Sequence, residues 1–486
     1  MRTVRRGLPG NQDPDLIISG SHVATIEIRQ HDQFGRYCSG KNDRADAGPA
    51  VTSARPVSRS GSHPIWKAIV SSLRLTEIED RPIARNVILL IGDGMGQAHR
   101  FAAQLLAAGR GGRLAMDRLP YVGEMGTTTV DPTSFVTDSA AAATAIATGV
   151  KTLNGSVSID LKGQERTTIL ELAKASGRSV GLVSTCQITD ATPAAFAAHV
   201  PHRADQSEVA RQYIERTGVD VILGGGAAHW YPDGAPLPEP LTVGSPCSGV
   251  GSDGNLVAMA CQLGYEFVTD AAALGASLDR RRREPAGPLL GLFAAQEFFV
   301  QTAEGFGAVY DPPVALADLT SAAIEILAQN PHGFFLMVEE SAIDRMAHRN
   351  NAPLMLKGVL ELDRAVQVAL AFAEHAPETL IVVTADHECG GLAVAGSEDQ
   401  PYPYEPGGGL LDTMLAGEDG PFPVADADYG FVVGWATTGH TATPVPITST
   451  GPGAERLTGE IENTDLFPVM AEAMDLSSIL AGSRPT

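Results

Sequence analysis

The sequence predicts an α/β fold with a largely parallel central sheet. From residue 86 onward, apolar runs of strand length alternate with longer helical stretches, and glycines separate the two. Such alternation is typical of folds in which helices connect parallel strands. With 486 residues, 44% of them hydrophobic, the chain can bury a large core in one globular unit or two domains.

Five buried strands and five helices carry this prediction. Uninterrupted apolar runs predict strands at 87–91, 179–183, 219–223, 334–338 and 380–383. Helical periodicity predicts helices at 97–108, 139–148, 168–176, 317–329 and 354–374, where Gly177 closes the third and Pro331 stops the fourth. In such sheets the active site lies beyond the carboxyl ends of the strands.

Two segments fall outside this pattern. Residues 1–80 are rich in Gly, Ser, Pro, Arg and Asp and have no sustained period, so we expect a loosely ordered extension there. The catalytic domain is expected at 81–480. Within it, residues 391–430 contain many Gly, Pro, Asp and Glu and predict a surface insertion between core strands.

The charge balance disfavours several classes of partner. With 57 acidic and 35 basic residues the formal net charge is -22, which disfavours binding to nucleic acid or anionic lipid. A phosphate substrate would also be repelled unless bound metal ions supplied local positive charge. No apolar stretch reaches the roughly 18 residues of a membrane-spanning helix, so none is expected.

The five cysteines do not form a disulfide scaffold or a CxxC zinc pair. Cys247 and Cys261 could pair in an oxidising compartment or stay free, because spacing alone does not fix disulfide geometry. Cys186 is expected to be a buried, small apolar residue. Cys389 is expected to be structural, with a thiol beside a metal as the alternative.

Carboxylates and histidines, the residue types that bind metals, come shortly after three of the predicted strands. They are Asp93 after the first strand, Glu339, Asp344 and His348 after the fourth, and Asp386 and His387 after the fifth. Asp344 and His348 are four residues apart, which places both on one face of a helical turn where they can reach one cation. The alternatives are a tight turn around Asp93 and an exposed polar pair at Asp344 and His348.

A serine begins the helix predicted at 139–148. Ser139 is followed by four alanines, whose small side chains would let the serine lie deep in a crowded site. The helix dipole and the free N–H groups of the first turn would favour an alkoxide and a phosphate there. Ordinary helix capping by Thr137, Asp138 or Ser139 is the alternative.

Together these motifs resemble the alkaline phosphatase family. Seven segments occur in that family's order between about residues 80 and 475: 91–96 (IGDGMG), 136–145 (VTDSAAAATA), 149–152 (GVKT), 190–195 (DATPAA), 338–348 (VE, with Asp344 and His348), 384–387 (TADH) and 438–441 (TGHT). The resemblance implies a three-layer sandwich around a large, mostly parallel sheet. It also implies a phosphomonoesterase that holds two zinc ions and one magnesium ion.

The resemblance assigns the ligands one position at a time. The first zinc would be held by Asp344, His348 and His440. The second would be held by Asp93, Asp386 and His387, with the Ser139 hydroxyl. Magnesium would take oxygen ligands, which suits a hard cation, from Asp93, Asp190, Thr192 and Glu339.

The resemblance also assigns the groups that handle phosphate. Ser139 would be the nucleophile that carries a phosphoserine intermediate. Arg203, thirteen residues after Asp190, would clamp two phosphate oxygens, oriented by Asp138. Family members vary at the position of Arg345, so we expect it to tune turnover through a water or through pairing with Asp190.

Two other readings remain open from the sequence. A phosphodiesterase or phosphonate hydrolase of the same superfamily would share the zinc sites but lack the arginine and magnesium groups. A non-catalytic metal- or phosphate-binding protein would usually lack the nucleophile or a ligand, and here each position is filled. A sulfatase is disfavoured because no cysteine begins a Cys-x-Pro-x-Arg motif.

The remaining expectations concern partners and location. The substrates would be small phosphate monoesters of broad range, because few groups would touch the leaving alcohol. The resemblance implies a homodimer and export to the periplasm or beyond. No apolar signal region follows the basic pair Arg5 and Arg6, so no secretory signal is visible in the sequence.

Overall fold

The computed structural model describes residues 82–239, 241, 248–284, 286–300, 309–397, 419–477 and 479. The predicted extension at 1–80, Cys247 and the middle of the predicted insertion lie outside these residues. Within the described part, no helix combines the length and the apolar character that crossing a membrane requires.

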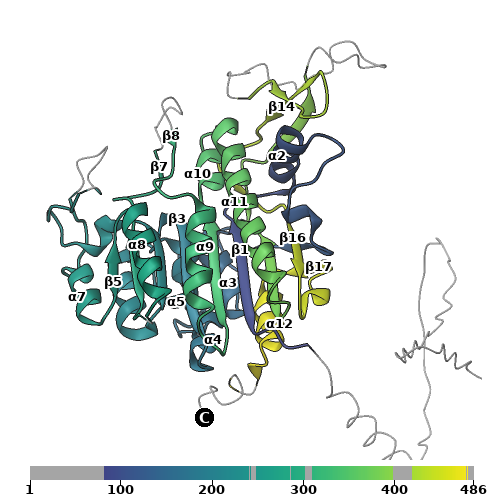
Figure 1. Cartoon of the computed structure of the whole chain (residues 1–486). Coiled ribbons are helices and arrows are strands. Elements are labelled where there is room, and N and C mark those ends of the chain that lie inside the picture. Colours follow the sequence, from purple (N-terminus) through teal and green to yellow (C-terminus); the bar gives the residue numbers. More distant parts are fainter. Residues whose placement is uncertain are drawn as a thin grey trace, which may run out of the picture. The chain divides into compact units, whose positions relative to one another are not determined.

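A ten-stranded sheet forms the centre of the described fold (Figure 1). Most neighbouring strands run parallel, whereas β16 pairs antiparallel with both β10 and β2. In spatial order the strands are β17 (Gly459–Glu462), β2 (Tyr121–Gly126), β16 (Val445–Thr450), β10 (Thr379–Thr384), β1 (Asn86–Gly92), β9 (Phe334–Glu340), β3 (Ser179–Gln187), β4 (Val221–Gly225), β6 (Leu289–Leu292) and β5 (Glu266–Val268).

Helices cover both faces of the sheet and complete the three layers. On one face α9 (Leu316–Leu327) packs against β3 and against α11 (Ala352–Ala373), which also contacts α2 (Gln97–Ala108). The other face is covered by α3 (Ser139–Thr148), α4 (Ile169–Ala175), α5 (Ala191–Ala197) and α12 (Leu466–Ala473). The remaining helices are α6 (Gln206–Gln212), α7 (Leu256–Gln262), α8 (Ala271–Arg281) and α10 (Ala342–Ala347).

The elements predicted from periodicity are present. Strands β1, β9 and β10 are buried along their whole length, as their uninterrupted apolar runs predict. Helices α2 and α3 occupy the predicted residues, and the other boundaries differ by only a few residues. Thr168 is the N-cap of α4 rather than its first residue, because its side chain accepts a hydrogen bond from the backbone N–H of Glu171.

Part of the predicted insertion is tied to α2. Strands β12 (Ala393–Gly396), β14 (Gly430–Gly434) and β13 (Phe422–Pro423) form a small antiparallel sheet. Asp426 accepts hydrogen bonds from the backbone N–H groups of Arg110 (2.9 Å) and Gly111 (3.2 Å), just after α2 ends. The ends of this segment are therefore held by the core.

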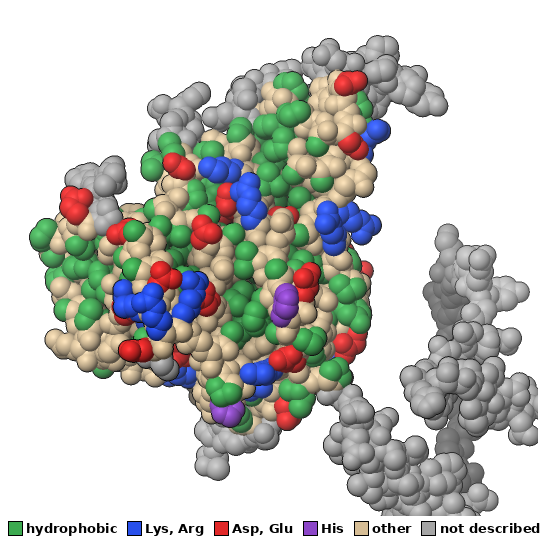
Figure 2. All heavy atoms as spheres, viewed as in Figure 1, with side chains coloured by type: hydrophobic (Ala, Val, Ile, Leu, Met, Phe, Trp, Pro, Cys, Tyr) green, Lys and Arg blue, Asp and Glu red, His purple; other side chains and the backbone are tan. Residues whose placement is uncertain are grey.

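The most basic run of the domain is neutralised by nearby acids. Arg281 and Arg282, at the end of α8, pair with Glu266 at 3.0 Å and with Glu325 at 2.7 Å. In Figure 2 the basic side chains over α8 lie directly beside acidic ones. This region therefore adds little net positive charge to the surface.

A buried ion pair joins α4 to the segment after α5 and predicts a pH-dependent stability. His199 faces an acceptor with each ring nitrogen: Glu171 Oε1 at 2.8 Å and the Ser158 carbonyl at 3.1 Å. Burial alone would lower the pKa of His199, but the bond to Glu171 outweighs burial and the opposing charge of Arg216 and raises it. For Glu171, burial would raise the pKa, but His199 lowers it.

The folded state therefore favours the charged pair. A raised histidine pKa gives stability that is complete below the unfolded value and is lost as pH rises through the folded value. We expect Glu171→Gln to reduce the free energy of unfolding by roughly 1–3 kcal/mol near pH 6 and by less near pH 9. Chemical denaturation at both pH values measures this, and an equal loss at both would contradict a charged His199.

Candidate active site

Three adjacent strands deliver the predicted ligands to one edge of the sheet. Strand β1 lies between β9 and β10 and is parallel to both, so the carboxyl ends of the three strands meet. Asp93 directly follows β1, Glu339 lies at the end of β9, and Asp386 and His387 follow β10. Their side chains are buried. The strand order thus converts separate sequence motifs into one site.

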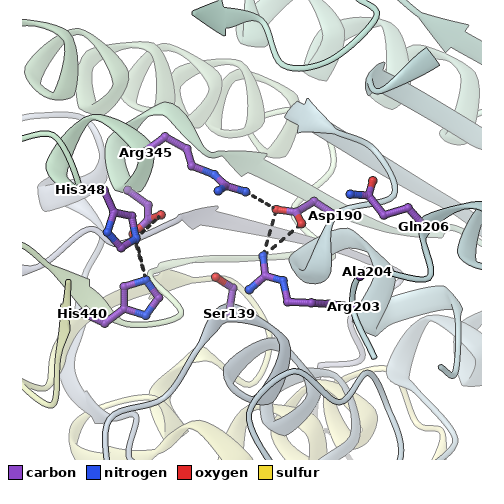
Figure 3. Close-up of a pocket in the computed structure, with 9 residues that line it drawn as sticks. Ser139, Asp190, Arg203, Ala204, Gln206, Arg345, His348 and His440 are labelled. Carbon is purple, nitrogen blue, oxygen red and sulfur yellow. Dashed lines mark hydrogen bonds and ion pairs between the residues drawn. The ribbon is translucent and has the colours of Figure 1, made fainter. Parts of the chain in front are cut away.

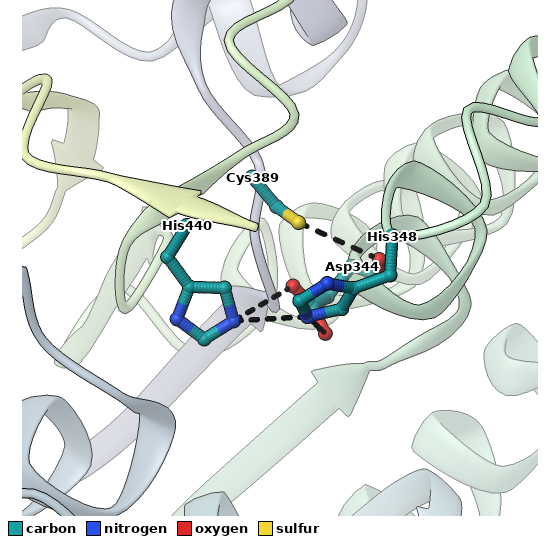
Figure 4. A group of neighbouring side chains, drawn as sticks. All are labelled: Asp344, His348, Cys389 and His440. Atoms are coloured by element: carbon teal, nitrogen blue, oxygen red, sulfur yellow. Dashed lines mark hydrogen bonds and ion pairs between the residues drawn. The ribbon is translucent and has the colours of Figure 1, made fainter. Parts of the chain in front are cut away.

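The first group of candidate metal ligands contains Asp344, His348 and His440 (Figure 4). The Asp344 carboxylate lies 3.3 Å from His348 Nε2 and 3.4 Å from His440 Nε2, and the two Nε2 atoms are 3.1 Å apart. Backbone carbonyls orient both rings: Thr438 O accepts from His348 Nδ1 at 2.6 Å, and Thr137 O from His440 Nδ1 at 2.9 Å. Each histidine therefore turns Nε2 toward Asp344, which is a typical arrangement of a metal-binding histidine.

The second group contains Asp93, Asp386 and His387. His387 Nε2 lies 3.2 Å from Asp386 Oδ2 and 3.6 Å from Asp93 Oδ1. The Ser139 hydroxyl oxygen lies 3.2 Å from the same His387 nitrogen. The rings of His387 and His440 stack with centroids 3.6 Å apart, so the two groups are immediate neighbours.

The chemistry of these groups fits bound cations. Three buried carboxylate oxygens of these groups, Asp93 Oδ1, Asp344 Oδ1 and Asp386 Oδ2, make no hydrogen bond among the described residues. The same holds for Glu339 Oε1, at the end of β9. Buried polar atoms without partners are costly unless an ion or a water satisfies them. Mixed carboxylate and imidazole ligands suit zinc.

The pKa values point the same way. Burial and the neighbouring carboxylates Asp386, Asp344 and Glu339 raise the pKa of Asp93 well above its usual range. Burial raises the pKa of Asp386 to about 6 and that of Glu339 to about 8. The protein has therefore gathered negative charge that positive ions would offset.

Hydroxyl groups surround the buried Glu339 carboxyl. Glu339 Oε2 accepts from the Ser184 hydroxyl at 2.5 Å, and the Thr192 hydroxyl lies beside the Glu339 carboxyl. Thr192 is in the first turn of α5, whose N-cap is Asp190. Hard oxygen donors without nitrogen suit Mg²⁺. Asp190 itself is turned toward two arginines.

Ser139 is the first residue of α3, and its neighbours fix its direction. Asp138 is the N-cap, and its Oδ1 accepts from the backbone N–H of Ala141 at 3.0 Å. Ser139 is only 3% exposed, and the small alanines behind it are buried. The capping alternative therefore applies to Asp138, whereas the Ser139 side chain is turned toward His387.

Two arginines face the pocket that contains Ser139 (Figure 3). Arg203 donates to Asp138 Oδ2 at 3.3 Å and to both oxygens of Asp190 at 3.1 and 3.2 Å. Arg345 donates to Asp190 Oδ2 at 2.9 Å, so the predicted pairing of these two residues is present. Burial would raise the pKa of Asp190, but Arg203 and Arg345 lower it to about 2. The pocket has a volume of about 420 Å³, and His348 and His440 line its other side.

Cys389 lies with the first group of ligands, as Figure 4 shows. Its Sγ is 3.8 Å from the backbone oxygen of Asp344, to which the thiol donates. Burial and the Asp344 charge raise the pKa of this thiol. Cys261 is exposed and free, and Cys186 is buried and free.

Sequence reasoning missed several groups that shape the site. Ser184, which binds Glu339, is a polar residue directly after a predicted strand, so the strand-end rule could have found it. Gln206 lines the pocket from the first residue of α6, and its amide oxygen accepts from Thr189 at 2.7 Å. The carbonyls of Thr137 and Thr438 carry no signal in the sequence, because every residue has one.

Comparisons with known proteins agree with this geometry. The alkaline phosphatase family profile matches residues 84–403. Alkaline phosphatase H of Pseudomonas aeruginosa is 36% identical over 81% of this chain and 86% of its own length. Streptomycin-6-phosphate phosphatase of Streptomyces griseus is also 36% identical, over 81% of this chain and 91% of its own length. The alkaline phosphatase of Escherichia coli is 36% identical over 82% and 88%.

Solved structures show the same fold. A variant of the TAB5 alkaline phosphatase, with magnesium bound in its M3 site, has a TM-score of 0.63 at 27% identity and covers 82% of this chain and 99% of its own. The Thermus thermophilus alkaline phosphatase has a TM-score of 0.63 at 26% identity, covering 82% and 94%. The chain therefore belongs to the alkaline phosphatase family, and it is a phosphoric monoester hydrolase with two groups of candidate metal ligands among the described residues.

Proposed function

We propose that this enzyme hydrolyses small phosphate monoesters of broad range through a phosphoserine on Ser139. The observation that carries the proposal is the placement of the Ser139 hydroxyl 3.2 Å from His387 and in one pocket with Arg203. Nucleophile, cation ligands and phosphate clamp thus lie within reach of one substrate phosphate.

The family resemblance implies three sets of ligands, and the two groups of candidate ligands described above support the two zinc sites. Asp344, His348 and His440 would hold one zinc ion, and Asp93, Asp386 and His387 the other. Asp93, Asp190, Thr192 and Glu339 would hold magnesium. When bound, these ions supply positive charge that lowers the pKa of coordinated hydroxyl groups and stabilises a departing oxygen.

The reaction has two displacements at phosphorus, and different side chains act in them. Ser139 Oγ loses its proton and attacks phosphorus, an O–P bond forms, and the ester P–O bond breaks to release the alcohol, which takes up a proton. Arg203 holds two phosphate oxygens with its planar fork, and Asp138 and Asp190 keep that fork in place. Water then attacks phosphorus, the bond between phosphorus and Ser139 Oγ breaks to release inorganic phosphate, and a proton from that water passes to Ser139 Oγ.

The positive end of α3 supports the first displacement. Free N–H groups of the first helical turn and the helix dipole favour negative charge at Ser139 and on the bound phosphate. Because Asp138 occupies the N-cap, it both stabilises α3 and orients Arg203. One residue thereby links the nucleophile to the phosphate clamp.

Hydrolysis of a nitrophenyl monoester compared with its diester tests the proposal. We expect the monoester to be strongly preferred, because Arg203 and the oxygen ligands around Glu339 favour a terminal phosphate. A preference for the diester would favour the superfamily alternative. Binding of phosphate without hydrolysis of either ester would favour a binding protein.

Arg345 should tune product release. It pairs with Asp190 and lines the pocket, so it adds positive charge where phosphate would bind. We expect Arg345→Ala to weaken inhibition by inorganic phosphate about 3- to 30-fold and to change kcat. Arg349→Ala, which removes an exposed arginine just beyond the end of α10, is the matched control. Unchanged kcat and phosphate inhibition in Arg345→Ala would exclude this role.

Further expectations remain predictions. The division into an extension at 1–80 and a catalytic domain at 81–480 follows from composition. Homodimer formation and export follow from the family resemblance. Ultracentrifugation and fractionation of expressing cells would measure these two properties.

A further inference from the structure

The two-residue segment Asn154–Gly155 contacts both the turn before Ser139 and the backbone of Arg203. These two parts of the site must be aligned for phosphoryl transfer. It lies in the loop after α3, sixteen residues beyond the N-cap Asp138. Asn154 is half-buried and Gly155 is buried. Neither residue lines the pocket, so neither is a candidate to contact the substrate.

The Asn154 amide clamps the turn that precedes the nucleophile. Its Oδ1 accepts from the backbone N–H of Asp138 at 3.1 Å, and its Nδ2 donates to the backbone oxygen of Val136 at 3.0 Å. The first partner can only donate and the second can only accept, so the orientation of the amide is fixed. The turn from Val136 to Asp138 leads directly into Ser139.

Gly155 contacts both Asp138 and Arg203, the residue proposed to hold phosphate. Its N–H donates to Asp138 Oδ2 at 3.0 Å, and its carbonyl accepts from the backbone N–H of Arg203 at 2.8 Å. The same Asp138 oxygen accepts from the Arg203 guanidinium at 3.3 Å. The segment thus holds Arg203 through its main chain, while Asp138 holds its side chain.

We propose that Asn154 is a positioning residue that fixes the Ser139 nucleophile relative to the Arg203 guanidinium. The proposal rests on the proposed function, in which Ser139 attacks the phosphate that Arg203 holds. In-line attack requires reacting atoms in close and aligned contact, and a shift of about 1 Å can cost about 100-fold in rate. Without Asn154 the turn at Val136–Asp138 loses the two Asn154 bonds and keeps those between Ser134 and the Val136 backbone. His440 also contacts this turn, because its Nδ1 bonds the Thr137 carbonyl, so metal content has to be measured together with activity.

Kinetics of Asn154→Ala on a monoester provide the first test. We expect kcat/KM to fall about 10- to 100-fold at saturating zinc and magnesium, where elemental analysis should show the same metal content as in wild type. Asn330→Ala is the matched control, because the Asn330 amide also bridges loop groups, the Gly177 carbonyl and the Ser179 hydroxyl, at the opposite end of β3. The control should keep wild-type kinetics. A kcat/KM for Asn154→Ala within about twofold of wild type would overturn the proposal.

A double-mutant cycle separates positioning from a general loss of structure. In an Arg203→Ala background there is no guanidinium to align, so Asn154→Ala should cost less than about 3-fold. An equally large cost in both backgrounds would overturn the proposal, since it would show that Asn154 acts independently of Arg203. If Asn154→Ala does not fold, Asn154→Asp, which keeps an acceptor for the Asp138 N–H, replaces it in the cycle.

Binding of inorganic phosphate distinguishes failure of this proposal from failure of the proposed function. Metal-loaded Asn154→Ala should bind phosphate about 10-fold more weakly than wild type, because Asp138, one of the two carboxylates that hold the Arg203 guanidinium, is less firmly placed. If wild type binds phosphate but hydrolyses no monoester, the proposed function fails while this comparison still tests Asn154. Equal phosphate affinity of the two proteins would then overturn the positioning role.

Discussion

Replacing Ser139 by alanine should reduce monoesterase activity by at least about 1000-fold while leaving the fold intact. The hydroxyl is the group from which the phosphoserine would form, and none of the described hydroxyls other than that of Ser139 lines the pocket. Removing it creates little strain, because Ser139 is buried among alanines and its hydroxyl contacts only His387 among the hydrogen-bond partners described. Steady-state kinetics and thermal unfolding of the variant measure the two parts of this prediction.

Labelled phosphate identifies the step that is lost. Wild-type enzyme quenched in acid during turnover should carry label on Ser139, and Ser139→Ala should carry none. Ser176→Ala, which removes a serine hydroxyl at the end of α4, is the control and should keep full activity. Substantial activity in Ser139→Ala would show that water attacks the substrate directly, and the covalent route would be rejected.

Removing the metal ions should abolish activity and also weaken the fold. Chelation is expected to leave below about 1% of the activity, and zinc with magnesium should restore it. Asp93, Asp386 and Glu339 are buried together, and burial raises the pKa of each, so the metal-free protein holds unfavourable charge. The melting temperature should therefore fall on chelation, because ions that bind the native state stabilise it.

A charge-neutral variant sharpens this prediction. Asp386→Asn removes one ligand but also one buried negative charge, since Asp386 is fully buried. We expect this variant to melt lower than wild type with metals and higher than wild type without them. A chelated wild-type protein that keeps its activity, or an Asp386→Asn variant that melts lower in both states, would argue against the two-group metal site.

Local sequence signals predicted the elements whose determinants are local. Strands β1, β9 and β10 are buried on both faces, so their residues form continuous apolar runs. Helix α3 carries its N-cap and closing glycine in sequence, and its boundaries were predicted correctly. By contrast, β17 is largely exposed and, among the described strands, pairs only with β2, so its residues have no periodic pattern that would predict a strand.

In the candidate site, too, some residues could be placed from local spacing and others could not. The spacing of Asp344 and His348 determines by itself that both reach one point, because residues four apart share a helical face. His440 joins them from far along the chain through the pairing of β15 (His440–Thr441) with β11 (Glu388–Cys389). The family resemblance assigned His440 to this group. The residues next to His440 in the sequence give no such indication.

Residue patterns along the chain were enough to predict the α/β class, the residue types available for metal binding and the helix that begins at Ser139. Only the folded chain reveals that β1 lies between β9 and β10, that Asp190 is shared by Arg203 and Arg345, and that Asn154 braces the turn before Ser139. Periodicity and capping depend on neighbours within a few residues, whereas strand order and side-chain pairing depend on contacts between segments distant in the chain.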